Sequence, residues 1–219
     1  MRDLKRFGAA AALLCALTYV YGFALMLTVL APSGIGAEHA DPATTVTFFA
    51  AHHGLVSSWY LAIYVVNGLA LAVLAVAMWD RFRPYLPGLA QVALTIGALW
   101  ATLVVGAGMV ANVGLAAVVD IHAADPVEAA RLWRVVEMVE NGLGGGNEIA
   151  GGIWAMLIGV AVLKTGLMSR AFGWVSLAIG AAGLSTVLPA LAPVTGAVFG
   201  LGYIAWFAWA GVALLRPVD

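Results

Sequence analysis

Glu148 is the residue whose type and position most clearly allow chemistry. It lies in "ENGLGGGNEIAGGIWAML" (residues 140–157), where Asn147 and Glu148 follow three glycines and precede a strongly apolar run. Burying a carboxylate in a membrane span costs several kcal/mol unless it is paired, hydrogen-bonded or protonated. A carboxylate kept there can hold a cation or exchange a proton, so Glu148 is the first candidate for contact with a ligand.

Residues around Glu148 recur at three- and four-residue steps, which places them on one face of a helix. This face comprises Glu137, Asn141, Gly145, Glu148, Gly152, Ala155 and Gly159. Because small residues let a neighbouring helix approach closely, we expect the face to turn toward protein or a water-filled space. The other side, with Ile149, Trp154 and Ile158, is expected to face lipid.

A second polar stripe follows the second predicted span. It steps by four, three, four and three residues through His53, Ser57, Tyr60, Tyr64 and Asn67. Such a row can line a crevice filled by water or ligand. Alternatively, the tyrosines anchor the helix at the membrane interface and Asn67 bonds a neighbouring helix. Asn67 fits both interpretations, whereas Tyr60 fits the anchor better.

A third, thinner stripe carries Thr95, Thr102 and Asn112. The threonines are expected to bond their own helix backbone, whereas Asn112 lies at a depth close to that of Glu148. The stripes predict a pocket between spans two, three and four, open to the outer side. Its candidate ligand-binding residues are Glu148, Asn147, Asn112, Tyr60, Asn67, His53 and Ser57. We expect Glu148 to face span two or three, beside at least one of Asn112, Ser57, Tyr60 and His53.

The histidines are not spaced as a metal site. Two of the 4 histidines are adjacent, so they point about 100° apart on a helix. A metal site would need His39, His53 and His122 to assemble with an acid such as Asp41 or Asp120. The sequence has no Walker motif, Rossmann fingerprint or G-x-S-x-G elbow. We therefore expect neither a metal nor another cofactor.

The composition is typical of a membrane protein. Of 219 residues, 63% are hydrophobic and 10% charged, and the mean hydropathy is +1.01, whereas soluble domains carry about 25% charged residues. The net charge of −1 gives no reason to expect nucleic-acid binding. The single cysteine, Cys15, excludes an intrachain disulfide.

Six apolar runs are long enough to cross about 30 Å of hydrocarbon, which predicts an all-α bundle forming one domain over residues 1–219. The runs cover approximately 7–30, 55–78, 88–119, 141–163, 171–191 and 194–215. The first could instead be a signal peptide, but it is longer than an apolar region of about 7–15 residues. An outer amphipathic helix is expected at about 126–140, because a proline follows Asp125 and apolar residues recur at helical spacing.

The basic residues predict the orientation. If the spans alternate, only Arg131 and Arg134 fall on one side, and the other side receives Arg2, Lys5, Arg6, Arg81, Arg83, Lys164, Arg170 and Arg216. By the positive-inside rule, both termini are then cytoplasmic. The expected partner is the lipid bilayer, and the expected location is a bacterial plasma (inner) membrane.

The segment "GGIWAMLIGVAVLKTGLMSRAFGWVSLAIGAAG", from Gly151 onward, is similar to the second half of small uncharacterised bacterial membrane proteins. In these proteins, a span with Trp and Gly leads through a short basic turn to a Gly-rich span. The matching residues are Trp154, Gly159, Gly166, Leu167, Arg170, Gly173 and Trp174. The resemblance implies an inner-membrane helical bundle and no known activity.

Three functional hypotheses follow. The first is a non-enzymatic bundle that binds or transports a small or lipophilic solute, with Glu148 as charge or proton partner; its small size for a transporter points to a homodimer. The alternative is a membrane-embedded enzyme in which Glu148, helped by His53, is a general acid or base on an isoprenoid or lipid. The third is a structural or accessory subunit whose polar residues only join helices.

Overall fold

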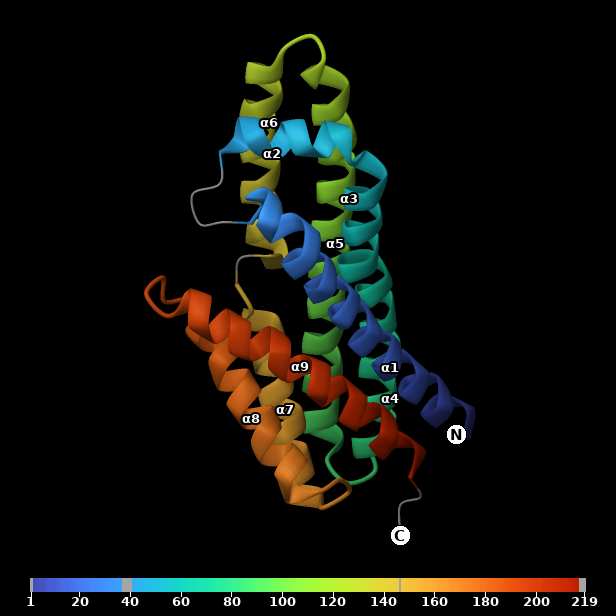
Figure 1. Cartoon of the computed structure of the whole chain (residues 1–219). Helices are drawn as coiled ribbons and strands as arrows, with labels where there is room; N and C mark the ends of the chain where they lie inside the picture. The colour runs from blue at the N-terminus through green and yellow to red at the C-terminus, as the bar shows by residue number, and fades with distance from the viewer. Residues whose placement is uncertain (1, 37–40, 146, 217–219) are drawn as a thin grey trace.

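The computed structural model describes residues 2–36, 41–145 and 147–216, and the regular elements in these ranges are helices (Figure 1). In them, 5 helices are long and apolar enough to cross a membrane. They cover residues 3–33, 53–82, 87–122, 126–165 and 192–215. The chain therefore has the all-α architecture of a multi-pass membrane protein.

Several of the long helices are not α-helical over their whole length. The first consists of α1 (Arg2–Leu25), the π-helical η1 (Met26–Leu30) and the short η2 (Ala31–Ser33). The second consists of α3 (His53–Tyr60), the π-helical η3 (Leu61–Val66) and α4 (Asn67–Phe82). The fourth is divided into α6 (Pro126–Glu140), the π-helical η4 (Asn141–Gly145) and α7 (Ile149–Thr165). The remaining elements are α2 (Pro42–Ala51), α5 (Pro87–His122), α8 (Arg170–Ser185) and α9 (Ala192–Leu215).

The helix boundaries follow local signals in the sequence. Asp41, Asp125 and Ser169 accept backbone N–H hydrogen bonds at the starts of α2, α6 and α8, which satisfies donors that a helix start leaves free. Gly166 ends α7 with φ 66°, a left-handed conformation that favours glycine. The helix predicted at 126–140 is present as α6, which packs along the upper part of α5 (Figure 1).

The small-residue face of α7 packs against α8. A Cβ added to Gly152 would lie 2.9 Å from the carbonyl oxygen of Gly180, and one added to Gly159 would lie 2.8 Å from that of Gly173. The expectation that this face turns toward protein is therefore confirmed, and its neighbour is the next helix in the chain.

The buried apolar residues form two clusters. The larger one joins α1, α4, α5, α7, α8 and α9, and at its centre Trp154 and Trp206 lie with ring centroids 5.2 Å apart. The smaller one joins α2, α3, α5 and α6 at the upper end of the molecule, around Trp133 and Phe49. Trp154 and Ile158 are buried in the larger cluster, so the prediction that they face lipid was wrong.

Helices cover the predicted runs 7–30, 55–78, 88–119 and 194–215 without a break, whereas the other two predicted runs differ from the structure. The fifth predicted span corresponds to α8, whose 16 residues reach about 24 Å and so fall short of a hydrocarbon core of about 30 Å. The fourth is interrupted between η4 and α7. The start of α1 and the end of α9 lie at the same end of the bundle, because α1 and α9 run side by side in opposite directions (Figure 1).

Candidate functional site

Glu148 lies at the interruption of the fourth long helix. It precedes the first residue of α7, and its backbone N–H donates to the Thr186 hydroxyl at 2.9 Å. This bond satisfies one donor that the start of α7 leaves free. Within the described part of the chain the carboxylate of Glu148 has no hydrogen-bond partner and no salt bridge. The interruption therefore exposes a carboxylate whose bonding capacity is unused.

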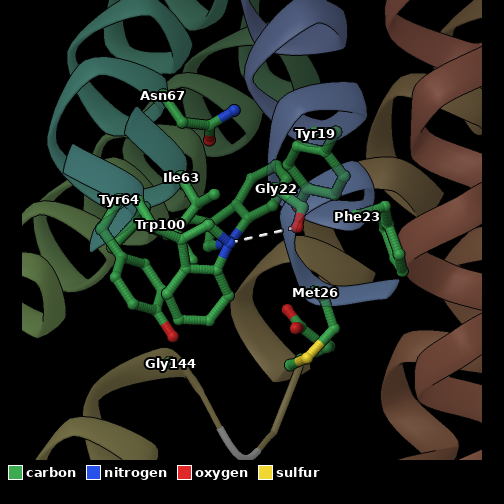
Figure 2. A pocket seen from close by; sticks show the side chains of 12 residues that line it. Tyr19, Gly22, Phe23, Met26, Ile63, Tyr64, Asn67, Trp100 and Gly144 are labelled. Atoms are coloured by element: carbon green, nitrogen blue, oxygen red, sulfur yellow. Dashed lines mark hydrogen bonds between the residues drawn. The ribbon is translucent and has the colours of Figure 1, made fainter. Parts of the chain in front are cut away.

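The side chain of Glu148 lines a cavity of about 250 Å³, which we call the Glu148 cavity (Figure 2). Its lining residues are Tyr19, Gly22, Phe23, Met26, Trp59, Ile63, Tyr64, Asn67, Trp100, Val104, Gly144 and Glu148. They come from the first, second, third and fourth long helices. The site is thus a space between helices that are far apart in sequence.

Two π-helical segments and a kink border the Glu148 cavity. Met26 belongs to the π-helical η1, and Ile63 and Tyr64 belong to the π-helical η3, whereas Gly144 interrupts η4 with a non-helical backbone (φ 163°). A π-helical turn contains an additional residue compared with an α-helical turn, and such turns occur often at functional sites. The helices that enclose the cavity therefore depart from regular winding beside it.

Several hydrogen-bond donors of the wall are already engaged within the protein. The Trp59 indole N–H donates to the carbonyl oxygen of Gly22 at 3.1 Å, the bond drawn in Figure 2. The Asn67 amide donates to the Thr18 hydroxyl at 2.8 Å. The Tyr64 hydroxyl donates to a carboxylate outside the lining, that of Glu140. These groups hold the wall together, whereas the Glu148 carboxylate remains free to accept.

The charge of the Glu148 cavity comes from a single residue. Among the lining residues there is no Lys, Arg or His, and Glu148 is the only carboxylate. Aromatic rings make up much of the remaining surface, with Tyr19 and Phe23 on α1, Tyr64 on η3 and Trp100 on α5 (Figure 2). The cavity is therefore an aromatic chamber with one acidic group.

The structure brings together two of the seven predicted site residues in this cavity, namely Glu148 and Asn67. Glu148 shares it with residues of spans two and three, as expected, but span one also forms a wall. The prediction that spans two, three and four enclose the pocket therefore omitted span one.

Four of the other predicted residues lie outside the cavity, three on α3 and one in the later part of α5. Ser57 donates to the Asn112 side-chain oxygen at 2.8 Å, which joins α3 to α5. Tyr60 is buried and lies next to Trp133 of α6. His53 is exposed at the start of α3. None of the four lines the Glu148 cavity.

The seventh predicted residue, Asn147, also lies between η4 and α7, but it faces away from the Glu148 cavity. It lines a second hollow together with Thr186 and Pro189, near the α8–α9 connection. Its side chain is thus separated from the Glu148 cavity although the two residues are adjacent in sequence.

Sequence reasoning missed two parts of the site. Tyr19, Phe23 and Met26 follow one face of the first helix at steps of four and three, a spacing that could have identified them. Glu140 was not among the predicted site residues, but it is buried and accepts a hydrogen bond from the Tyr64 hydroxyl at the edge of the cavity wall. No sequence spacing connects Tyr64 with Glu140, because they lie on different helices.

A metal site among the histidines finds no support in the described residues. In them no group of three or more His, Cys, Asp and Glu side chains could hold an ion. His52 and His53 are exposed, and His52 stacks on Phe48 with ring centroids 4.3 Å apart. His39, which the assembled site would have used, lies outside the described residues.

Comparison with known protein families gives a match over most of the chain. A family described as a domain of unknown function (DUF4386) matches residues 6–215. The resemblance in the second half of the chain therefore extends over nearly its whole length. No curated protein and no solved structure matches the chain.

Proposed function

The chain belongs to the DUF4386 family, a domain of unknown function, and we propose that it binds or transports a small or lipophilic solute in the Glu148 cavity. The observation that carries this proposal is the free carboxylate of Glu148 in an aromatic cavity without a cationic side chain. A carboxylate in such surroundings is costly unless a partner or a proton compensates it. A bound solute would supply that partner.

The expected depth of the cavity supports access from the outer side. Lys164 lies at the end of α7 that also carries the basic turn to α8, and Glu148 lies about 24 Å from it along the helix. In a hydrocarbon core of about 30 Å, Glu148 is then near the outer boundary. The orientation is part of the proposal: both termini are cytoplasmic, α8 together with the residues 186–191 that follow it makes the sixth crossing, and the membrane is a bacterial plasma membrane.

The enzymatic alternative receives less support from the geometry. It required His53 to act beside Glu148, but His53 is exposed and does not line the cavity. The bond between Asn67 and Thr18 fits the third hypothesis, in which polar residues only join helices. That hypothesis does not account for a free carboxylate, so we favour solute binding.

A solute screen tests the proposal directly. The purified protein in lipid nanodiscs is screened by thermal shift against small neutral and charged lipophilic compounds, and hits are followed by uptake into proteoliposomes. We expect stabilising compounds whose effect is lost in Glu148→Gln. Glu148→Leu should still fold and should also lose the response. A screen without hits, combined with unchanged stability of Glu148→Gln, would contradict the proposal. Light scattering of the same sample tests the proposed homodimer.

A further inference from the structure

Resting on the proposed solute site, we propose that the Glu148 cavity selects an organic cation, an amine or quaternary ammonium with a short apolar tail. Charge is the first reason. The lining offers one carboxylate and no Lys, Arg or His. An anionic solute would lose its water without gaining a charged partner, and it would also face Glu148. A cation gains a charge-assisted contact with the carboxylate.

The aromatic wall is the second reason. Tyr19, Phe23, Trp59, Tyr64 and Trp100 all line the cavity. The faces of aromatic rings attract a cation, and clusters of such rings are used to recognise quaternary ammonium groups. Figure 2 shows labelled rings on opposite sides of the cavity, from α1, η3 and α5. The rings and the carboxylate therefore favour the same kind of ligand.

The engaged donors are the third reason. Trp59, Asn67 and Tyr64 already donate to protein acceptors. A solute that needs several hydrogen-bond donors, such as a sugar or a carboxylic acid, would compete with these bonds. A solute that donates hydrogen bonds, or a positively charged solute without donors, leaves these three hydrogen bonds of the wall intact. Three of the five side-chain donors in the lining are thus engaged; the Tyr19 hydroxyl and the Trp100 indole N–H have no partner in the described part of the chain, and Glu148 is the charged acceptor of the lining.

The size and apolar part of the cavity indicate the rest of the ligand. About 250 Å³ is below the roughly 300–1,000 Å³ of pockets for drug-sized ligands, so a small head group fits. Met26, Ile63 and Val104 add aliphatic surface between the rings. This surface suits a short alkyl chain beside the head group.

The test uses three probes that share one alkyl chain: hexyltrimethylammonium, hexanol and hexanesulfonate. Binding to the full chain in nanodiscs is measured by calorimetry, and the signal from empty nanodiscs is subtracted to remove partitioning into lipid. We expect the cation to bind at least about tenfold more tightly than hexanol, which corresponds to about 1.4 kcal/mol. Hexanesulfonate should bind more weakly than hexanol.

Variants assign the preference to its source. Glu148→Gln should remove the advantage of the cation over hexanol, whereas Glu137→Gln should keep it, because Glu137 is exposed on α6 and outside the cavity. Phe23→Leu keeps apolar bulk but removes a ring face, so it should weaken the cation more than hexanol. Thermal unfolding of each variant verifies that it is folded.

Three results would overturn the cation proposal. One is equal binding of hexanol and hexyltrimethylammonium, which would leave solute binding itself intact. Another is a cation preference that survives Glu148→Gln. If none of the three probes binds, the cation proposal is also overturned, and the separate thermal-shift screen of neutral compounds decides whether the cavity binds a solute at all.

Discussion

Tyr64 donates its hydroxyl to the carboxylate of Glu140, which joins the π-helical η3 to the last residue of α6 beside the Glu148 cavity. Glu140 is 8% exposed, so this bond satisfies a largely buried acidic group. Removing one partner of such a bond leaves the other without compensation and costs about 1–3 kcal/mol.

Tyr64→Phe should therefore lower the free energy of unfolding by about 1–3 kcal/mol, measured by SDS titration of the protein in mixed micelles. Tyr21→Phe is the matched control, because the Tyr21 hydroxyl bonds Ser58 at an exposed position, 3.0 Å apart. The control should change stability less. Equal losses of unfolding free energy in the two variants would show that the buried bond to Glu140 stabilises the protein no more than the exposed bond does.

Gly152→Ala should destabilise the contact between α7 and α8. The added Cβ would lie 2.9 Å from the Gly180 carbonyl oxygen and 3.0 Å from the Leu184 nitrogen. Because both are backbone atoms, the helices must separate, and overpacking of this kind costs about 1–3 kcal/mol. Gly196→Ala on α9 meets nothing within 4 Å and should be neutral or stabilising. A harmless Gly152→Ala in the same unfolding assay would contradict the close packing.

Asp41 should make the stability of α2 depend on pH. The Thr44 hydroxyl and the backbone N–H groups of Ala43 and Thr44 donate to its carboxylate and hold the pKa of Asp41 below its usual value. The folded carboxyl thus binds a proton less readily than the unfolded one. The cap contributes fully above the unfolded pKa of about 3.9, and its contribution is lost as the pH falls through the lowered folded pKa.

Amide exchange over residues 42–51, corrected for the intrinsic pH dependence of exchange, measures this effect. Protection of α2 in the unaltered protein should decline at acidic pH. Asp41→Asn, which keeps an acceptor but cannot titrate, should not show this decline. Identical pH profiles for the two proteins would rule out the cap as the cause.

The long helices could be predicted from composition alone, because a run of about 20 apolar residues has few alternatives to a membrane helix. The starts of α2, α6 and α8 also follow local capping residues. Glu148 could be singled out because a carboxylate beside an apolar run is costly unless a partner is found. These inferences depend on residues close together in sequence.

The wall of the site depends on how the helices pack against one another. The spacing of residues along a single helix carries no information about this packing. The stripe through Glu148 was treated as one continuous helix, but the interruption after η4 changes the direction of Asn147 relative to Glu148. Trp154 was assigned to lipid because it lies opposite the glycines of α7. It is buried because α5 and α9 cover that side with Trp100 and Trp206.

The membrane orientation gives the last prediction. We assume that the end of the bundle that carries most Lys and Arg residues is cytoplasmic. A cysteine introduced at Asp125, at the opposite end, should then react with a membrane-impermeant thiol reagent added to intact cells. Cysteines at Tyr85 and Arg170 should react only after the cells are opened. All three positions are exposed. The natural Cys15 is buried as well, so it should give no background. Labelling of Tyr85→Cys and Arg170→Cys in intact cells, with Asp125→Cys protected, would reverse the orientation and place the Glu148 cavity toward the cytoplasm.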